Sequence, residues 1–319
     1  MLKICKKIFT LFLHWFNIQL THRIYIRFVS NILIWRDKMK VLKNGLLGML
    51  ILGGMLIGSN VAEARSRVIQ AKGSDTILNV SQAISENYMK ENRKARIAVT
   101  GGGSGVGISA LINGTTDIAM ASRSIKDKEI EQAKAKGLEV KEVVLGFDGI
   151  TIISNHANPV KDLDDLTLGK VFRGEITNWK ELGGEDAPIV VLSRDSSSGT
   201  HEFFKEHIIR ENNTKKDLEY GPKTLYMPSN EAIKQEVKAN KYAIGYIGMG
   251  YMDDSVEVIK VDGVEASVEN VASKKYPIAR EVYWYVDSNA SEEVNGLVDY
   301  ALSSKGQELV KEEGFVPVK

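Results

Sequence analysis

The chain has 319 residues, of which 43% are hydrophobic and 26% charged, enough for one large domain or two lobes and without any sign of disorder or repeats. Residues 1–64 hold 9 Lys and Arg and 2 Asp and Glu, so residues 65–319 carry 33 basic and 39 acidic side chains, a net charge of −6. This acidic body argues against nucleic acid or an anionic membrane as a partner.

The first recognisable element is an uncharged apolar run at residues 45–58, which follows Lys40 and Lys43 and precedes Ala62-Glu63-Ala64. Basic, apolar and small residues in this order predict a signal peptide over residues 39–64, cleaved after Ala64, and export from the cytoplasm. The run is shorter than the roughly 18–20 residues that span a bilayer. An uncleaved anchor is the alternative, and the absence of a cysteine at the cleavage site argues against a lipoprotein.

Residues 1–38 are basic and apolar and stand upstream of a signal that is complete from Met39. We expect translation to start at Met39 and residues 1–38 to come from an over-extended gene prediction. An additional membrane-associated leader is the alternative. The only cysteine, Cys5, lies in this segment, so residues 65–319 have no disulfide and no thiol nucleophile.

From residue 67 onward, strand-like apolar runs alternate with helical patterns. The expected strands are residues 67–71, 95–99, 117–122, 143–155, 189–195, 243–248 and 280–287. The main expected helices are residues 77–88, 108–112, 129–136, 199–209, 232–240 and the stretch around 291–313. This alternation predicts an α/β protein with parallel strands. The long extended runs at 143–155 and 278–287 are expected to pass between two lobes.

Four polar clusters stand at the carboxyl ends of expected strands. They are Gly73–Thr76, Gly103–Gly105, Ser122–Ser124, and Arg194 with Ser198–Thr200. Ligands of open α/β sheets bind at this edge, where helix starts offer unpaired N–H groups. Hydroxyls add further donors, and an arginine supplies a rigid fork that matches an oxyanion. Each cluster alone is typical of a helix cap or a loop, but together they predict a site for a small tetrahedral oxyanion.

Three enzyme motifs are only partly matched. The loop GGGSGVG lacks the Gly-Lys-Ser/Thr of a nucleotide-binding loop, and Val106 replaces the last glycine of a nucleophile elbow. The segment HEFFK has Lys205 where a zinc protease motif has histidine. We expect His201 and His207 to cover a helix surface. No metal and no cofactor are expected.

Several segments in order resemble the periplasmic phosphate-binding protein of the high-affinity phosphate ABC transporter, over nearly all of residues 67–319. They are KGSDTILNVSQA, VTGGGSGVGISALINGTTDIAMASR, GFDGITIISN, VFRGEITNWKELGG, SRDSSSGT, AIGYIGMGY and YPIAREVYWYV. The resemblance implies an α/β, two-lobed periplasmic binding-protein fold of type II. Lobe 1 would comprise residues 65–148 and 282–319, and lobe 2 residues 149–281. Each would be a mainly parallel sheet flanked by helices, and two crossover strands would join them.

The resemblance implies binding and no catalysis. The ligand would be inorganic phosphate, the partners would be the membrane permease subunits of an importer, and the protein would be a monomer. The family's binding pattern falls here on Ser74, Thr76, Ser104, Arg194, Ser198, Gly199 and Thr200.

Two positions depart from that pattern. Arg123, itself a candidate ligand, stands where some members have an aspartate that accepts phosphate's proton, and His201 stands where arginine is frequent. Asp75 or Asp148 is expected to take over the proton-accepting role, with Asp148 preferred because it lies at the crossover. A receptor of the same fold for sulfate, molybdate or arsenate is one alternative. A secreted phosphatase that uses Ser104 or Ser198 as nucleophile is another.

Overall fold

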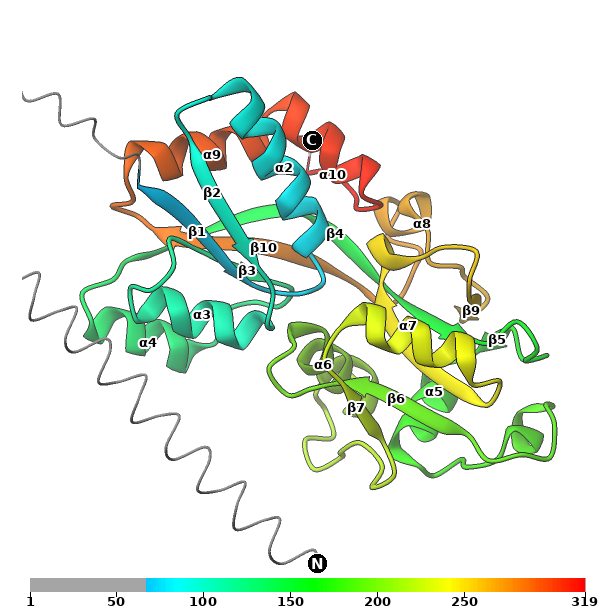
Figure 1. Ribbon diagram of the computed structural model, residues 1–319. Coiled ribbons are helices and arrows are strands. Elements are labelled where there is room, and N and C mark those ends of the chain that lie inside the picture. Colours follow the sequence, from blue (N-terminus) through cyan, green and yellow to red (C-terminus); the bar gives the residue numbers. More distant parts are fainter. Residues whose placement is uncertain (1–66, 319) are drawn as a thin grey trace, which may run out of the picture. The chain divides into compact units, whose positions relative to one another are not determined.

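The computed structural model describes residues 67–318, and the predicted leader and signal peptide lie outside this range. The described chain forms two α/β lobes joined by two long strands (Figure 1). Within residues 67–318, one path of hydrogen-bonded strands runs in the order β2-β1-β3-β10-β4-β8-β6-β7, and β9 joins it beside β4.

The first lobe is built on a parallel core of three strands, β1 (Val68–Gly73), β2 (Arg96–Thr100) and β3 (Ile118–Ala121). Alternate side chains of β3 face opposite sides of the sheet, as the period of two in a strand requires. Ile118 and Met120 pack with one group of helices, and Ala119 and Ala121 with the other. The first group is α2 (Leu78–Glu91), α9 (Glu292–Leu302) and α10 (Ser304–Glu312), and the second is α3 (Ser104–Ile112) and α4 (Asp127–Ala135).

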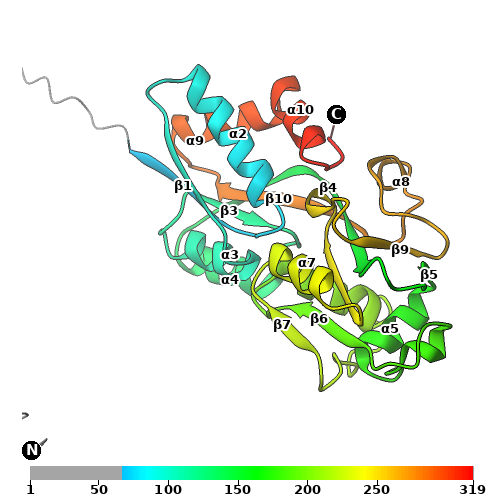
Figure 2. The ribbon, with the colours of Figure 1, turned by 45° about the vertical axis from the view of Figure 1, so that its right-hand side comes forward.

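The second lobe also contains a group of parallel strands covered by helices. Strands β6 (Val190–Arg194) and β7 (Leu225–Met227) pair in parallel, as do β6 and β8 (Ala243–Gly248). Figures 1 and 2 both show helix α7 (Asn230–Ala239) lying against β6. The other helices are α5 (Asp165–Arg173), α6 (Gly199–Phe204), which continues into a π-helical turn (Lys205–Ile209), and α8 (Val268–Ala272), with short 3₁₀ turns at Trp179–Leu182 and Met249–Tyr251.

Two strands connect the lobes, β4 (Val140–Ser154) and β10 (Ala279–Asp287). β4 pairs with β10 over residues 140–149 and with β8 and β9 (Glu257–Val261) over its last residues. From Gly149 to Ser154 every residue of β4 is buried, which explains why three of these six residues are isoleucine.

The fold class predicted from the sequence is confirmed, with one refinement. β10 runs antiparallel to both β3 and β4, because it returns from the second lobe, so the sheet is mixed. The alternation of patterns also did not indicate β5 (Asp162–Leu163), β7, β9 or α8, which have two to five residues each. None of the helices between residues 67 and 318 combines the length and apolar composition needed to cross a bilayer.

Candidate functional site

Buried hydroxyl groups of the first lobe gather where its strands end and its helices begin. Ser74 follows β1, Ser104 opens α3, and Ser122 follows β3. The Ser74 hydroxyl donates to Ser122 Oγ at 2.9 Å, and Ser122 Oγ lies 3.3 Å from Ser104 Oγ. The Ser122 backbone N–H also donates to Ser104 Oγ at 3.0 Å. All three side chains are buried, so this edge of the sheet is a cluster of hydroxyls shielded from solvent.

The start of helix α6 brings the second lobe onto this cluster. Thr200 Oγ1 lies 2.7 Å from Thr76 Oγ1, and both side chains are buried. A β-carbon at Gly199 would overlap the hydroxyls of Ser104 and Ser122, so only glycine allows this approach. Ser198 caps the helix, because its Oγ accepts from the backbone N–H groups of Thr200 and His201. The sequence therefore builds a helix start that presses directly against the opposite lobe.

Arg194, the last residue of β6, is buried against both lobes, with 1% of its side chain exposed. Its Nη1 lies 3.3 Å from Asp75 Oδ2, and its Nη2 donates to the Pro228 carbonyl at 3.0 Å. Its Nε has no hydrogen-bond partner within residues 67–318. A buried donor without a hydrogen-bond partner destabilises the folded protein by about 1–3 kcal/mol. The Arg194 Nε–H group can therefore still donate a hydrogen bond to a bound anion.

An ion pair between the two crossover strands adjoins the cluster. Asp148 Oδ2 accepts from Arg280 Nη2 at 2.8 Å and from Nε at 3.2 Å, while its Oδ1 accepts from the Met249 N–H. Arg280 also donates to the Ser122 carbonyl and to Thr200 Oγ1, each at 2.8 Å. Burial raises the pKa of the Asp148 carboxyl, and the Arg280 charge beside it acts in the opposite direction.

Asp75 is held from the opposite lobe. Its Oδ2 accepts from the backbone N–H and the side-chain amide of Asn230, at 2.9 and 2.7 Å, in addition to Arg194. The cluster thus contains two guanidinium groups and two carboxylates, whose formal charges cancel. An anion placed here would be bound mainly by N–H and O–H dipoles and by the guanidinium forks.

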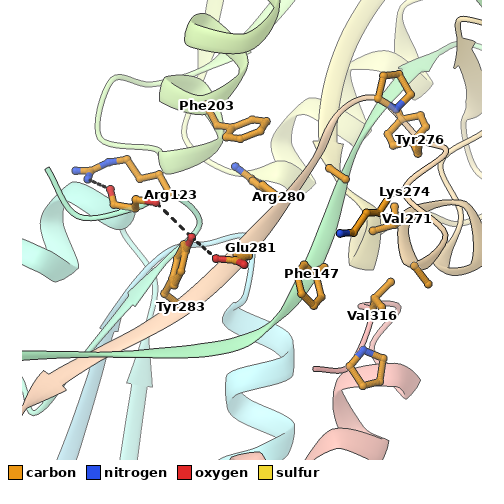
Figure 3. Close-up of a pocket in the computed structure, with 15 residues that line it drawn as sticks. Arg123, Phe147, Phe203, Val271, Lys274, Tyr276, Arg280, Glu281, Tyr283 and Val316 are labelled. Atoms are coloured by element: carbon orange, nitrogen blue, oxygen red, sulfur yellow. Dashed lines mark hydrogen bonds between the residues drawn. The ribbon is translucent and has the colours of Figure 1, made fainter. Parts of the chain in front are cut away.

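Not every predicted residue joins the cluster. Arg123 Nη1 and Nη2 bind Glu129 at 2.9 and 2.7 Å, and Figure 3 shows the arginine at the rim of a different cavity. The expectation that His201 covers a helix surface is wrong. Its ring is buried, stacks on Tyr220 with centroids 4.7 Å apart, and lies 3.2 Å from Ser193 Oγ through Nδ1.

Three members of the cluster were missing from the residues predicted as ligands. Arg280 had a usable signal, since it is an arginine inside an extended apolar run. Ser122 belongs to a recognised polar cluster and lies inside a segment that resembles the family, but the family's binding pattern did not fall on it. Asn230 had no signal, because an asparagine at a helix start is ordinary.

The cavity that Arg123 borders is separate from the hydroxyl cluster. It has a volume of about 680 Å³ and lies along the crossover strands (Figure 3). Phe147 pairs with Glu281, and Asp148 with Arg280. Because neighbouring side chains alternate faces, Phe147 and Glu281 line the cavity while Asp148 turns toward the hydroxyl cluster. Among the residues that the structure describes, only Arg280 both lines this cavity and bonds to the hydroxyl cluster. Within the described residues there is no group of three His, Cys, Asp or Glu side chains that could hold a metal ion.

Comparison with known proteins gives consistent results. The PBP superfamily domain matches residues 60–305. The chain is 32% identical to the phosphate-binding protein PstS of Bacillus subtilis, over 80% of this chain and 82% of the relative. It is 30% identical to PstS of Borreliella burgdorferi, over 79% and 91%.

A solved structure from Clostridium perfringens, of a substrate-binding protein assigned to a phosphate ABC transporter and with bound phosphate, superimposes with a TM-score of 0.73. It is 36% identical to this chain and is matched over 79% of this chain and all of that one. The sequence and the two-lobed fold agree with these relatives, and the chain belongs to the PstS-like family of phosphate-binding proteins within the PBP superfamily.

Proposed function

We propose that this protein binds inorganic phosphate outside the cytoplasm and delivers it to an ABC importer. The observation that carries the proposal is the cluster of Ser74, Thr76, Ser104, Ser122, Ser198 and Thr200 hydroxyls, all buried, beside an Arg194 guanidinium whose Nε has no partner within residues 67–318. The phosphate held by the Clostridium perfringens relative supports the choice of ligand.

Selectivity would come from a carboxylate. Phosphate at neutral pH retains a proton that a carboxylate can accept, whereas sulfate presents only acceptor oxygens. Sites that depend on such a hydrogen bond discriminate by roughly 10⁴–10⁵-fold. Asp148, which lies deeper and touches the Arg280 that binds Thr200, and Asp75, which touches Arg194, are the two candidates. Loss of phosphate-over-sulfate preference in Asp148→Asn or in Asp75→Asn would identify the acceptor.

Binding would require the lobes to open and close. We place the lobe boundaries near Asp148 and near Val282, so that lobe 1 comprises residues 65–148 and 282–319 and lobe 2 residues 149–281. The direct contacts Thr76–Thr200 and Gly105 N–H to the Ser197 carbonyl support a hinge in β4 and β10, because both contacts join the two lobes.

We further propose export through the predicted signal peptide, a monomeric state, and recognition of the closed form by permease subunits. The net charge of −6 for residues 65–319 implies that local dipoles, rather than a global positive field, attract the anion. Binding should therefore depend only modestly on salt.

Two other functions make different predictions. A receptor for sulfate, molybdate or arsenate would share the cluster but rank the anions differently. A phosphatase would need an activated nucleophile, and neither Ser104 nor Ser198 has a histidine as hydrogen-bond acceptor for its hydroxyl within residues 67–318. These contacts and the family favour binding without turnover.

Titration calorimetry of residues 65–319 separates these functions. We expect tight 1:1 binding of phosphate, weak or no binding of sulfate and molybdate, and no hydrolysis of p-nitrophenyl phosphate. Preference for sulfate or molybdate would overturn the ligand assignment. Sustained hydrolysis, abolished by Ser104→Ala or Ser198→Ala, would overturn the non-enzymatic role.

A further inference from the structure

Asn230 is fully buried at the first position of helix α7, and its contacts extend beyond its own lobe. Its backbone N–H and its Nδ2 both donate to Asp75 Oδ2 in the first lobe, at 2.9 and 2.7 Å. Its Oδ1 accepts from the Gly248 N–H at 3.1 Å, which fixes the amide orientation. The side chain is therefore oriented by its own lobe so that it presents donors to the other.

Asp75 collects contacts from three elements of the second lobe. Helix α7 contributes the two Asn230 donors, and β6 contributes Arg194. The turn after β8 contributes Tyr251, whose hydroxyl donates to the Asp75 carbonyl at 2.7 Å. A carboxylate at a helix N-terminus is further stabilised by the helix dipole. These bonds join the lobes through protein groups alone.

We propose that Asp75 and Asn230 form a latch that holds the lobes closed and sets anion affinity through closure. The inference rests on the proposed function. Apparent affinity scales with the fraction of molecules in the binding-competent form. Weakening the latch should therefore weaken binding of every anion by the same factor, and the ratio of phosphate to sulfate affinity should not change.

The decisive variant is Asn230→Asp. An aspartate at this position still accepts from Gly248 but loses the side-chain donor and places a carboxylate against Asp75. The double variant Asp75→Asn with Asn230→Asp restores a donor–acceptor pair in reversed order. Asn230→Ala removes the donor without adding charge, which covers the case in which Asn230→Asp does not fold.

A matched control is Ser229→Ala. Ser229 caps the same helix, with its Oγ accepting from the Ala232 N–H at 3.0 Å, but it makes no hydrogen bond to Asp75. Lobe closure is read from spin labels at Lys134→Cys and Lys223→Cys, two exposed positions in different lobes. Residues 65–319 contain no cysteine of their own, so labelling is confined to these sites.

Without ligand, we expect Asn230→Asp and Asn230→Ala to increase the share of the long label distance. We also expect phosphate and sulfate affinities to fall together, with phosphate binding weakened about tenfold or more for Asn230→Asp. The double variant should recover the label distances of the wild type, and Ser229→Ala should match the wild type in both label distances and affinities.

Unchanged label distances in the Asn230 variants, a changed phosphate-to-sulfate ratio in Asn230→Asp or Asn230→Ala, or no recovery of the label distances in the double variant would each overturn the latch. If the unaltered protein binds no phosphate, the proposed function fails, but the label distances and their rescue still decide the latch.

Discussion

Arg194 is the residue on which the anion site depends most directly. Its guanidinium is buried, is oriented by Asp75 and the Pro228 carbonyl, and has an Nε without a partner within residues 67–318. Charge-assisted hydrogen bonds of this kind contribute about 1.5–3 kcal/mol each. We therefore expect Arg194→Ala to weaken phosphate binding by about 100-fold or more, measured by calorimetry.

Arg194→Lys provides the control, because it keeps the charge but loses the planar fork. Its affinity should lie between those of the wild type and Arg194→Ala. Wild-type affinity in the alanine variant would show that the anion binds elsewhere.

The burial of His201 has a consequence for stability. Burial lowers the pKa of its imidazole in the folded protein, whereas in the unfolded chain the pKa is about 6.5. As the pH falls from about 7 through this window, the unfolded state takes up a proton that the folded state does not. The free energy of unfolding should therefore decrease, and His201→Gln should reduce this pH dependence in urea titrations at several pH values.

Two other histidines also affect how the free energy of unfolding depends on pH. Burial also lowers the pKa of His207, which adds to the same trend. Hydrogen bonding to Glu257 raises the pKa of His156, which has the opposite effect, since that contribution is lost as the pH rises through the folded pKa. His156→Gln should therefore steepen the loss of stability on acidification. A steeper loss in His201→Gln as well would contradict the assigned role of burial.

At the scale of the elements, function depends on how closely helix α6 approaches helix α3. A β-carbon at Gly199 would overlap Ser104 and Ser122 across the lobes. Overpacking of this kind costs about 1–3 kcal/mol, and here the cost falls on the closed form. We expect Gly199→Ala to weaken phosphate binding by roughly 10- to 100-fold, with little change in urea stability of either lobe.

Gly105→Ala is a control at the same interface. A β-carbon there would meet the Ser197 carbonyl oxygen at 3.5 Å, which is ordinary contact. This variant should bind phosphate nearly as well as the wild type. Equal losses in both variants would show that glycine at the interface is required for some reason other than the predicted overlap.

These helix starts can be predicted from the sequence because strand and helix patterns depend on residues that are close together in the chain. The apolar periodicity of residues 67–122, the helix start near Ser104 and the cap at Ser198 follow from short stretches, and their observed positions agree within a few residues. The partners of Asp75 and Asp148 are 155 and 132 residues away, at Asn230 and Arg280. Pairing across such distances depends on tertiary packing, and no local pattern encodes it.

At the scale of the whole molecule, the two crossover strands carry a buried ion pair. Asp148 and Arg280 stand opposite each other in β4 and β10, and both are nearly inaccessible to solvent. Removing one partner of such a pair leaves an uncompensated buried charge, at a cost of about 3–5 kcal/mol. We expect Arg280→Met to lower the free energy of unfolding by about that amount in urea titrations.

The double variant Asp148→Leu with Arg280→Met removes both charges. It should be more stable than either single variant, because the penalty arises from one unpaired charge. Strictly additive losses would indicate that the two side chains act independently.

The most direct test of the anion site is a crystal structure of residues 65–319 grown with phosphate. We predict one phosphate between the lobes, within hydrogen-bond distance of Ser104, Thr200 and Arg194, with Arg123 still bound to Glu129. Phosphate found instead in the cavity beside Phe147 and Glu281, with no anion at the hydroxyl cluster, would contradict the assignment.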